Sequence, residues 1–188
     1  SFAARLNFKG TVATLEDFDA RFADGYLKAK GTYQRDTSLF DLDIEGKNLQ
    51  ASRLRPLVTD DKDFPAFAGT IDLTAKATGK GDQFSTFNIA FQGSGQNITI
   101  NDNAVGTINF VGTTVNQLLK AEVTANLEGQ SQVATASINF ADERLPFRAE
   151  TNFNQTELAP FVALFRPADS VAINGKATGN ISFGGNLY

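Results

Sequence analysis

Strict alternation of apolar and polar residues is the feature that most constrains the fold of this chain. Large apolar residues recur at every second position over short runs, and a period of 3.6 residues is nearly absent. The clearest examples are residues 87–91, 98–100, 108–110, 123–127 and 138–140, with Leu6/Phe8 and Phe40/Leu42/Ile44 nearer the N-terminus. Such alternation places one face of a strand against apolar material and the other in water, as in antiparallel meanders.

Turn signals divide these runs at hairpin spacing. They occur at residues 9–10, 24–25, 93–95, 101–103 and 128–129, most of them containing Gly. The pattern predicts roughly twelve strands, most of about five to nine residues.

A repeated segment marks the two places where a helix is predicted. Residues 48–58 align without a gap on residues 152–162, and four pairs are identical: Asn48/Asn152, Leu54/Leu158, Pro56/Pro160 and Val58/Val162. Each copy follows a strand-like run and precedes a segment that opens on Gly69 or Gly175. Repetition of this kind is typical of architectures that extend in one dimension.

Each copy carries the signals of a short helix. Ser52 and Thr156 are preferred N-cap residues, and each is followed by apolar residues at helical spacing. These stripes are Leu54/Leu57/Val58 and Leu158/Phe161/Val162. We expect the second helix to reach Phe165, since Pro167 follows, and we expect both helices to lie on the apolar face of the sheet or at one end of it.

A sheet with one apolar face must close into a barrel, form a sandwich or curl around a ligand. An open groove accommodates inserted helices better than a barrel does. The predicted fold is therefore mainly β: a long antiparallel amphipathic sheet curled into an open groove with an apolar interior and one or two short helices. We expect residues 1–188 to be one continuous segment of a longer protein, with two similar sub-units at about 40–80 and 146–188.

The composition excludes most catalytic chemistry. The chain has no His and no Cys, which removes most zinc, copper and haem sites, thiol nucleophiles and Ser-His-Asp hydrolases. Asp41, Asp43 and Glu45 alternate with apolar residues and should face water, while residues 60–63 lack the Gly and distal Glu of an EF-hand loop. We expect no enzyme activity, no cofactor and no bound metal. A net charge of −4 without a basic cluster also argues against a nucleic-acid partner.

The seventeen Phe residues are a large apolar load. They are typical of a Phe-rich core, and they are also compatible with an apolar surface kept open for a lipid-like ligand. Composition leaves both interpretations open.

The repeated motif resembles that of the AsmA-like and TamB-like bacterial envelope proteins. It consists of a strand, Asn-Leu followed by Leu-x-Pro, a short spacer and a strand that opens on Gly. Here it is carried by Asn48–Leu49, Leu54–Pro56 and Gly69–Leu73, and again by Asn152–Phe153, Leu158–Pro160 and Gly175. The second copy departs from the first downstream, where the segment 175–179 has small residues in place of Ile71 and Leu73.

The resemblance implies a groove in the bacterial periplasm, within a protein anchored in the inner membrane. Phospholipid acyl chains would move along the apolar interior towards the outer membrane, and other regions of the full protein would meet an outer-membrane barrel partner in membrane-protein assembly. The residues predicted to line the groove are Phe87, Ile89, Phe91, Ile98, Ile100, Ile108, Phe110, Val123, Leu127, Ile138 and Phe140.

Two other functions stay open at this point. One is a structural β-sandwich or solenoid interaction module of an envelope or adhesive protein, its interior filled by its own side chains. The other is a barrel that binds one small apolar ligand, or an enzyme built only on carboxylates, either of which would need a closed cavity or facing carboxylates.

Overall fold

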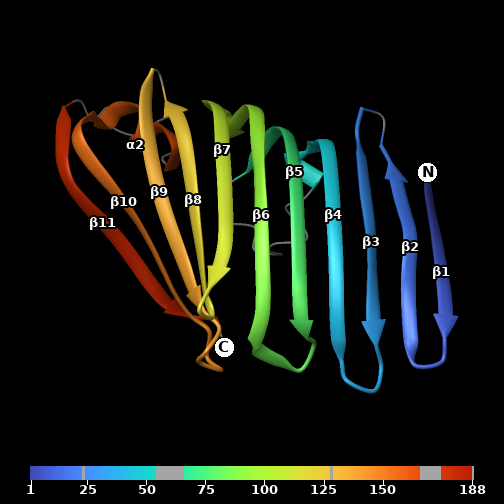
Figure 1. Ribbon diagram of the computed structural model, residues 1–188. Helices are drawn as coiled ribbons and strands as arrows, with labels where there is room; N and C mark the ends of the chain where they lie inside the picture. The colour runs from blue at the N-terminus through green and yellow to red at the C-terminus, as the bar shows by residue number, and fades with distance from the viewer. Residues whose placement is uncertain (23, 54–65, 128, 166–174, 188) are drawn as a thin grey trace.

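The protein is one open antiparallel sheet. A computed structural model describes residues 1–22, 24–53, 66–127, 129–165 and 175–187, and across them eleven strands pair in chain order from β1 to β11 (Figure 1). The strands are β1 (Phe2–Lys9), β2 (Val12–Arg21), β3 (Tyr26–Gln34), β4 (Leu39–Gln50), β5 (Phe67–Lys80), β6 (Gln83–Ile100), β7 (Asn103–Val115), β8 (Leu118–Leu127), β9 (Gln130–Asn139), β10 (Pro146–Glu157) and β11 (Lys176–Asn186). The prediction of a mainly β, open antiparallel sheet is confirmed.

Tight turns join several neighbouring strands. Asn101 and Asp102 both have positive φ, which is the geometry of a type I′ hairpin turn, so the turn predicted there is confirmed. Asn116 and Gln117 adopt the same pair of angles without any Gly, and this turn was not predicted. The predicted break at residues 93–95 is wrong, because these residues lie inside the 18-residue strand β6. The strands are correspondingly longer than predicted.

Bulges bend several strands near one end of the sheet. The pairing register shifts between Gly46 and Leu49 in β4, between Gly95 and Ile98 in β6, and between Phe153 and Thr156 in β10. A residue with φ near +50° lies inside each shift: Asn48, Asn97 and Gln155. A bulge adds one residue to a strand and increases its bend and twist. The bulges therefore make these strand ends curl.

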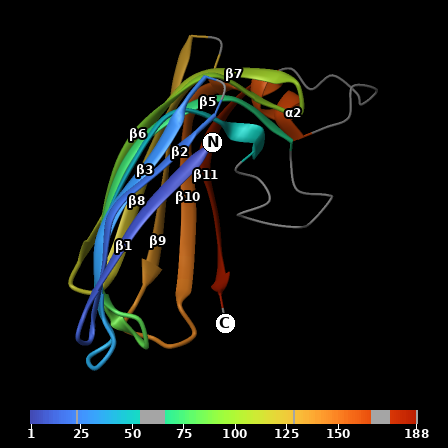
Figure 2. The ribbon, with the colours of Figure 1, turned by 90° about the vertical axis from the view of Figure 1, so that its right-hand side faces the viewer.

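The two helical segments follow the bulges of β4 and β10. Residues 51–53 are helical, and α2 spans Leu158–Phe165; both lie on the side toward which the sheet curls (Figure 2). The predicted N-caps are wrong. Ser52 lies within the helical residues, and Thr156 is a β10 residue whose Oγ1 accepts a hydrogen bond from the Asn154 amide at 3.2 Å.

The equivalence of the two copies also differs from the gapless sequence alignment. The bulge residue Asn48 corresponds to Gln155 in the structure, rather than to Asn152. Gly69 and Gly175 do correspond, and both have positive φ; Gly69 lies near the start of β5, and Gly175 lies just before β11. The predicted helical stripe Leu54/Leu57/Val58 and Pro56 lie outside the described residues. Within the described part of the chain, no helix has the length and apolar character needed to cross a membrane.

Asp72 on β5 holds the bulge of β4 in place. Its carboxylate accepts a hydrogen bond from the Asn48 backbone amide at 2.8 Å and one from Lys47 Nζ at 2.9 Å. The bond from the Asn48 amide, followed by the Lys47 ammonium, lowers the pKa of Asp72 below its ordinary value of 3.8. The bulge amide, which lies outside the strand ladder, thus has a charged acceptor.

Asp72→Ala should destabilise the protein by about 1–2 kcal/mol, because the bulge amide loses its acceptor. Asp72→Asn should cost less, since its amide oxygen can still accept that bond. A group with a lowered folded-state pKa stabilises the fold above its unfolded pKa and loses this contribution as the pH falls through the folded value. The difference in urea midpoint between wild type and Asp72→Ala should therefore be full at pH 7 and shrink below about pH 4. A difference that stays constant into strong acid would contradict the assigned role.

Candidate apolar groove

One face of the sheet carries continuous lanes of apolar residues that run across the strands. Residues paired in register on neighbouring strands point to the same face, so the pairing defines a central lane through all eleven strands. Its members are Ala4, Phe18, Ala29, Ile44, Ala75, Phe91, Gly112, Ala121, Ala136, Ala149 and Phe183. None of these residues is polar. We call this face the inner face; it is the face on which Leu49 and the residues of the core cluster described below also lie.

A second lane lies two residues closer to the helical segments, and we call it the helix-side lane. Its members are Phe2, Ala20, Leu27, Gly46, Leu73, Gly93, Phe110, Val123, Ala134, Thr151 and Ile181. Only Thr151 carries a polar group, and its hydroxyl donates to the Val133 carbonyl at 2.9 Å.

A third lane, the turn-side lane, lies two residues away on the other side of the central lane. Its members are Leu6, Leu15, Gly31, Leu42, Ala77, Ile89, Thr114, Leu119, Ile138, Phe147 and Gly185. The Thr114 hydroxyl accepts a hydrogen bond from the Ile89 amide at 3.0 Å. With strands about 4.8 Å apart, the lanes run for about 48 Å across the sheet.

Packed side chains border the lanes on both sides. On the helix side, Ile98, Val105 and Leu127 form a buried cluster, with Ile71, Ile100, Ile108 and Ala125 packed against it. On the turn side, the Phe87 ring contacts the rings of Phe40, Phe84 and Phe140, with centroid distances of 5.3, 5.5 and 5.9 Å. Phe87 lies on β6 and Phe140 directly follows β9, with β7 and β8 between these strands, so the sheet must bend sharply here. Among the described residues, no large side chain is more than 98 % buried.

All of the predicted lining residues lie on the inner face, and they come from β6 to β9 and the residue after β9. Burial divides them into two groups. Ile98, Leu127 and Phe140 are only 3–6 % exposed, so they belong to the packed borders. The others are partly or well exposed: Phe87, Ile89, Phe91, Ile100, Ile108, Phe110, Val123 and Ile138.

The predicted set omitted both edges of the sheet. Phe2 and Phe8 on β1 are 80 % and 71 % exposed, and Ile181 and Phe183 on β11 are also well exposed. The same alternation of apolar and polar residues is present in β1 and β11, so it identifies these four residues as inner-face residues. The apolar surface is therefore wider than the sequence prediction.

The opposite, outer face is charged. Lys76 lies 3.4 Å from both Asp41 and Asp43, and these carboxylates raise the pKa of Lys76. Glu45 accepts a hydrogen bond from the Tyr26 hydroxyl at 2.7 Å, which raises the pKa of Tyr26. Asp41, Asp43 and Glu45 thus face outward as predicted. Their partners are cations and a phenol on a solvated surface, an arrangement without a facing carboxylate pair for acid–base catalysis.

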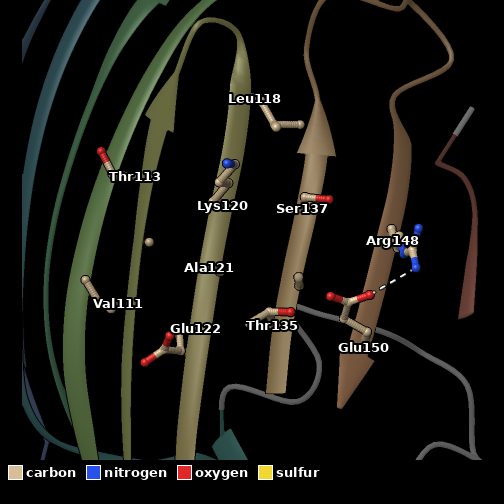
Figure 3. A pocket seen from close by; sticks show the side chains of 12 residues that line it. Val111, Thr113, Leu118, Lys120, Ala121, Glu122, Thr135, Ser137, Arg148 and Glu150 are labelled. Carbon is tan, nitrogen blue, oxygen red and sulfur yellow. Dashed lines mark ion pairs between the residues drawn. The ribbon is translucent and has the colours of Figure 1, made fainter. Parts of the chain in front are cut away.

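A shallow hollow of about 580 Å³ lies on the outer face over β7 to β10 (Figure 3). Polar side chains line most of it, among them Lys120, Glu122 and the ion pair of Arg148 with Glu150 at 3.1 Å. None of the predicted lining residues contributes to this hollow. Val111, which is 50 % exposed, and Leu118 are apolar residues that line the hollow from the outer face and depart from the polar pattern of this face.

Two further results bear on function. Among the residues that the structure describes, no group of three or more acidic side chains is placed to hold a metal ion. No family model, curated protein or solved structure significantly matches this chain.

One buried amide holds β9 and β10 together where their backbone pairing stops. These strands pair only between Ala134/Thr151 and Ile138/Phe147. Beyond that point Gln132, which is 9 % exposed, donates from Nε2 to the Asn152 carbonyl at 2.6 Å and to Thr151 Oγ1 at 2.7 Å. The Gln132 side chain therefore replaces a missing strand-to-strand bond.

Gln132→Leu should lower the free energy of unfolding by about 1–3 kcal/mol, because the Asn152 carbonyl and the Thr151 hydroxyl lose their hydrogen bonds from the buried Gln132 amide. Gln92→Leu is the matched control, since Gln92 lies exposed on the outer face of β6. Urea denaturation followed by circular dichroism measures both. Equal midpoints for the two variants would show that the Gln132 bonds do not hold the strands together.

Proposed function

We propose that this chain provides an apolar groove for phospholipid acyl chains, as a segment of an AsmA-like or TamB-like lipid-transfer protein. The observation that carries the proposal is the set of inner-face lanes, which are partly exposed and carry no polar side chain across the eleven strands apart from Thr114 and Thr151. A sheet face of this extent that served only as a core would be expected to be fully covered, since monomeric proteins rarely expose apolar patches larger than a few hundred Å².

The lanes suit a hydrocarbon chain that must move. An acyl chain makes no hydrogen bonds, and burying each CH₂ group is worth about 0.8 kcal/mol. The lanes offer small and apolar side chains at every strand, and the hydroxyls of Thr114 and Thr151 are occupied by backbone groups. A chain sliding from strand to strand therefore exchanges one apolar contact for a similar one, without a polar group to stop it.

The larger setting follows from the sequence resemblance. We place the groove in the bacterial periplasm, as part of a protein anchored in the inner membrane, with phospholipid moving between the inner and outer membranes. Other regions of that protein would contact an outer-membrane barrel partner.

Native mass spectrometry with lipid extraction tests the proposal. The protein is purified from bacterial membranes in mild detergent and then freed of it. We expect co-purified phospholipid with the wild type and its loss with Phe110→Asp, because a carboxylate in the helix-side lane would have to be desolvated by the acyl chain. Val111→Asp is the matched control, since the neighbouring side chain points to the outer face and is well exposed.

The far-UV circular dichroism spectrum should be the same for the wild type and both variants. A lipid-free wild type with a cooperative transition at high temperature would mean that the groove is filled by the protein itself. The chain would then be a structural or interaction module.

A further inference from the structure

Glycines on the inner face lie under aromatic rings of the neighbouring strand. Phe91 on β6 pairs with Gly112 on β7, and Phe110 on β7 pairs with Gly93 on β6. Both strands thus carry the sequence Phe-x-Gly, and the antiparallel register sets each Phe against the other strand's Gly. The two rings are 6.3 Å apart, with an interplanar angle of 45°.

The contacts show that these rings lie over the glycine backbone. A Cβ atom added at Gly112 would be 2.3 Å from Phe91 Cζ, and one added at Gly93 would be 2.4 Å from Phe110 Cζ. Distances this short leave no room for a methyl group. Each ring occupies the space that a side chain would fill on the next strand, so it rests along the floor of the groove.

A related pair occurs at the other end of the sheet. Phe147 on β10 pairs with Gly185 on β11, and a Cβ at Gly185 would be 3.2 Å from the Phe147 ring. Phe183 pairs with Ala149 and lies 6.3 Å from Phe147. Ala149 replaces the second glycine of the β6–β7 arrangement.

We propose that Gly112, by letting Phe91 lie flat, sets the depth of the groove and makes it accept lipids with two acyl chains. This inference rests on the proposed lipid-binding function. Adjacent lanes are about 7 Å apart, so the outer two lanes are about 14 Å apart. Hydrocarbon chains in contact lie only about 4–5 Å apart, since carbon–carbon contacts are about 3.5–4 Å. The floor is therefore wide enough for two acyl chains. The height of the Phe91 ring above the backbone then determines how much of the groove's depth is left for them.

Gly112→Ala isolates this role. The nearest atoms to the added methyl group all belong to the Phe91 ring, and the φ angle of Gly112 is not in the left-handed region, so the backbone tolerates Ala. The ring must then move, and we expect it to rise from the floor into the groove. Gly93 does not serve the same purpose, because a methyl there would also lie 2.3 Å from the Asp72 carbonyl oxygen.

Gly179→Ala is the matched control. Gly179 lies on β11 two residues from Ile181, also without a left-handed φ, and an added Cβ would have no neighbour within 4 Å. Phe91→Leu combined with Gly112→Ala is the rescue variant, since the shorter side chain makes room for the methyl group. These variants separate ring displacement from a general effect of the substitution.

The experiment titrates each protein with dioleoyl phosphatidylglycerol and with oleic acid, and native mass spectrometry gives the bound fractions. We expect the wild type and Gly179→Ala to bind both lipids. Gly112→Ala should bind the two-chain lipid about tenfold more weakly, equivalent to ~1.4 kcal/mol, and retain oleic acid. The rescue variant should recover the two-chain lipid.

Two results would overturn the inference while leaving the proposed function intact. One is unchanged binding of the two-chain lipid by Gly112→Ala. The other is an equal loss of both lipids, which would mean that the displaced ring does not select by chain number. A wild type that binds neither lipid would instead refute the proposed function and this inference with it.

Discussion

The whole structure depends on the register of an antiparallel sheet being kept across eleven strands. Side chains alternate between faces, so a slip of one residue at any pair would move every following apolar side chain to the solvated face. The central lane from Ala4 to Phe183 shows that no such slip occurs. Apolar residues on one face and ion pairs on the other are two consequences of the same pairing.

Bulges give this sheet its curl without breaking the lanes. In β4, Gly46 and Leu49 are three residues apart, whereas their β5 partners Leu73 and Ile71 are two residues apart. The extra residue of the bulge shifts the alternation of β4 by one position, so Leu49 still lies on the inner face. Asp72 fixes the extra residue by binding the Asn48 amide. The pairs of a Phe ring over a Gly affect the depth of the groove. They keep bulky Phe side chains close to the backbone of the curved sheet. Curvature and a shallow floor together make a groove from a sheet that would otherwise be a slab.

The alternation of apolar and polar residues was enough to predict the fold class and the face of every candidate lining residue, and the helical spacing of Leu158, Phe161 and Val162 predicted α2. The alternation could not locate the bulges. The runs at 87–91 and 98–100 have opposite parity, which predicts a turn between them, whereas the structure has a bulge at Asn97 within one strand. The helix caps failed for a related reason, since Thr156 is used by the β10 bulge. Burial of Ile98, Leu127 and Phe140 depends on the bend of the sheet, which one-dimensional periodicity does not contain.

The central claim is that the inner face, along its whole length, meets hydrocarbon. Photo-crosslinking in bacterial cells tests it most directly, with a photoreactive amino acid placed at Phe18, Ala75 or Ala136 in the central lane and at the outward neighbours Asp19, Lys76 or Ser137. We expect phospholipid adducts at each central-lane position and none at the outward neighbours. Adducts on both faces alike, or at no central-lane position, would contradict it.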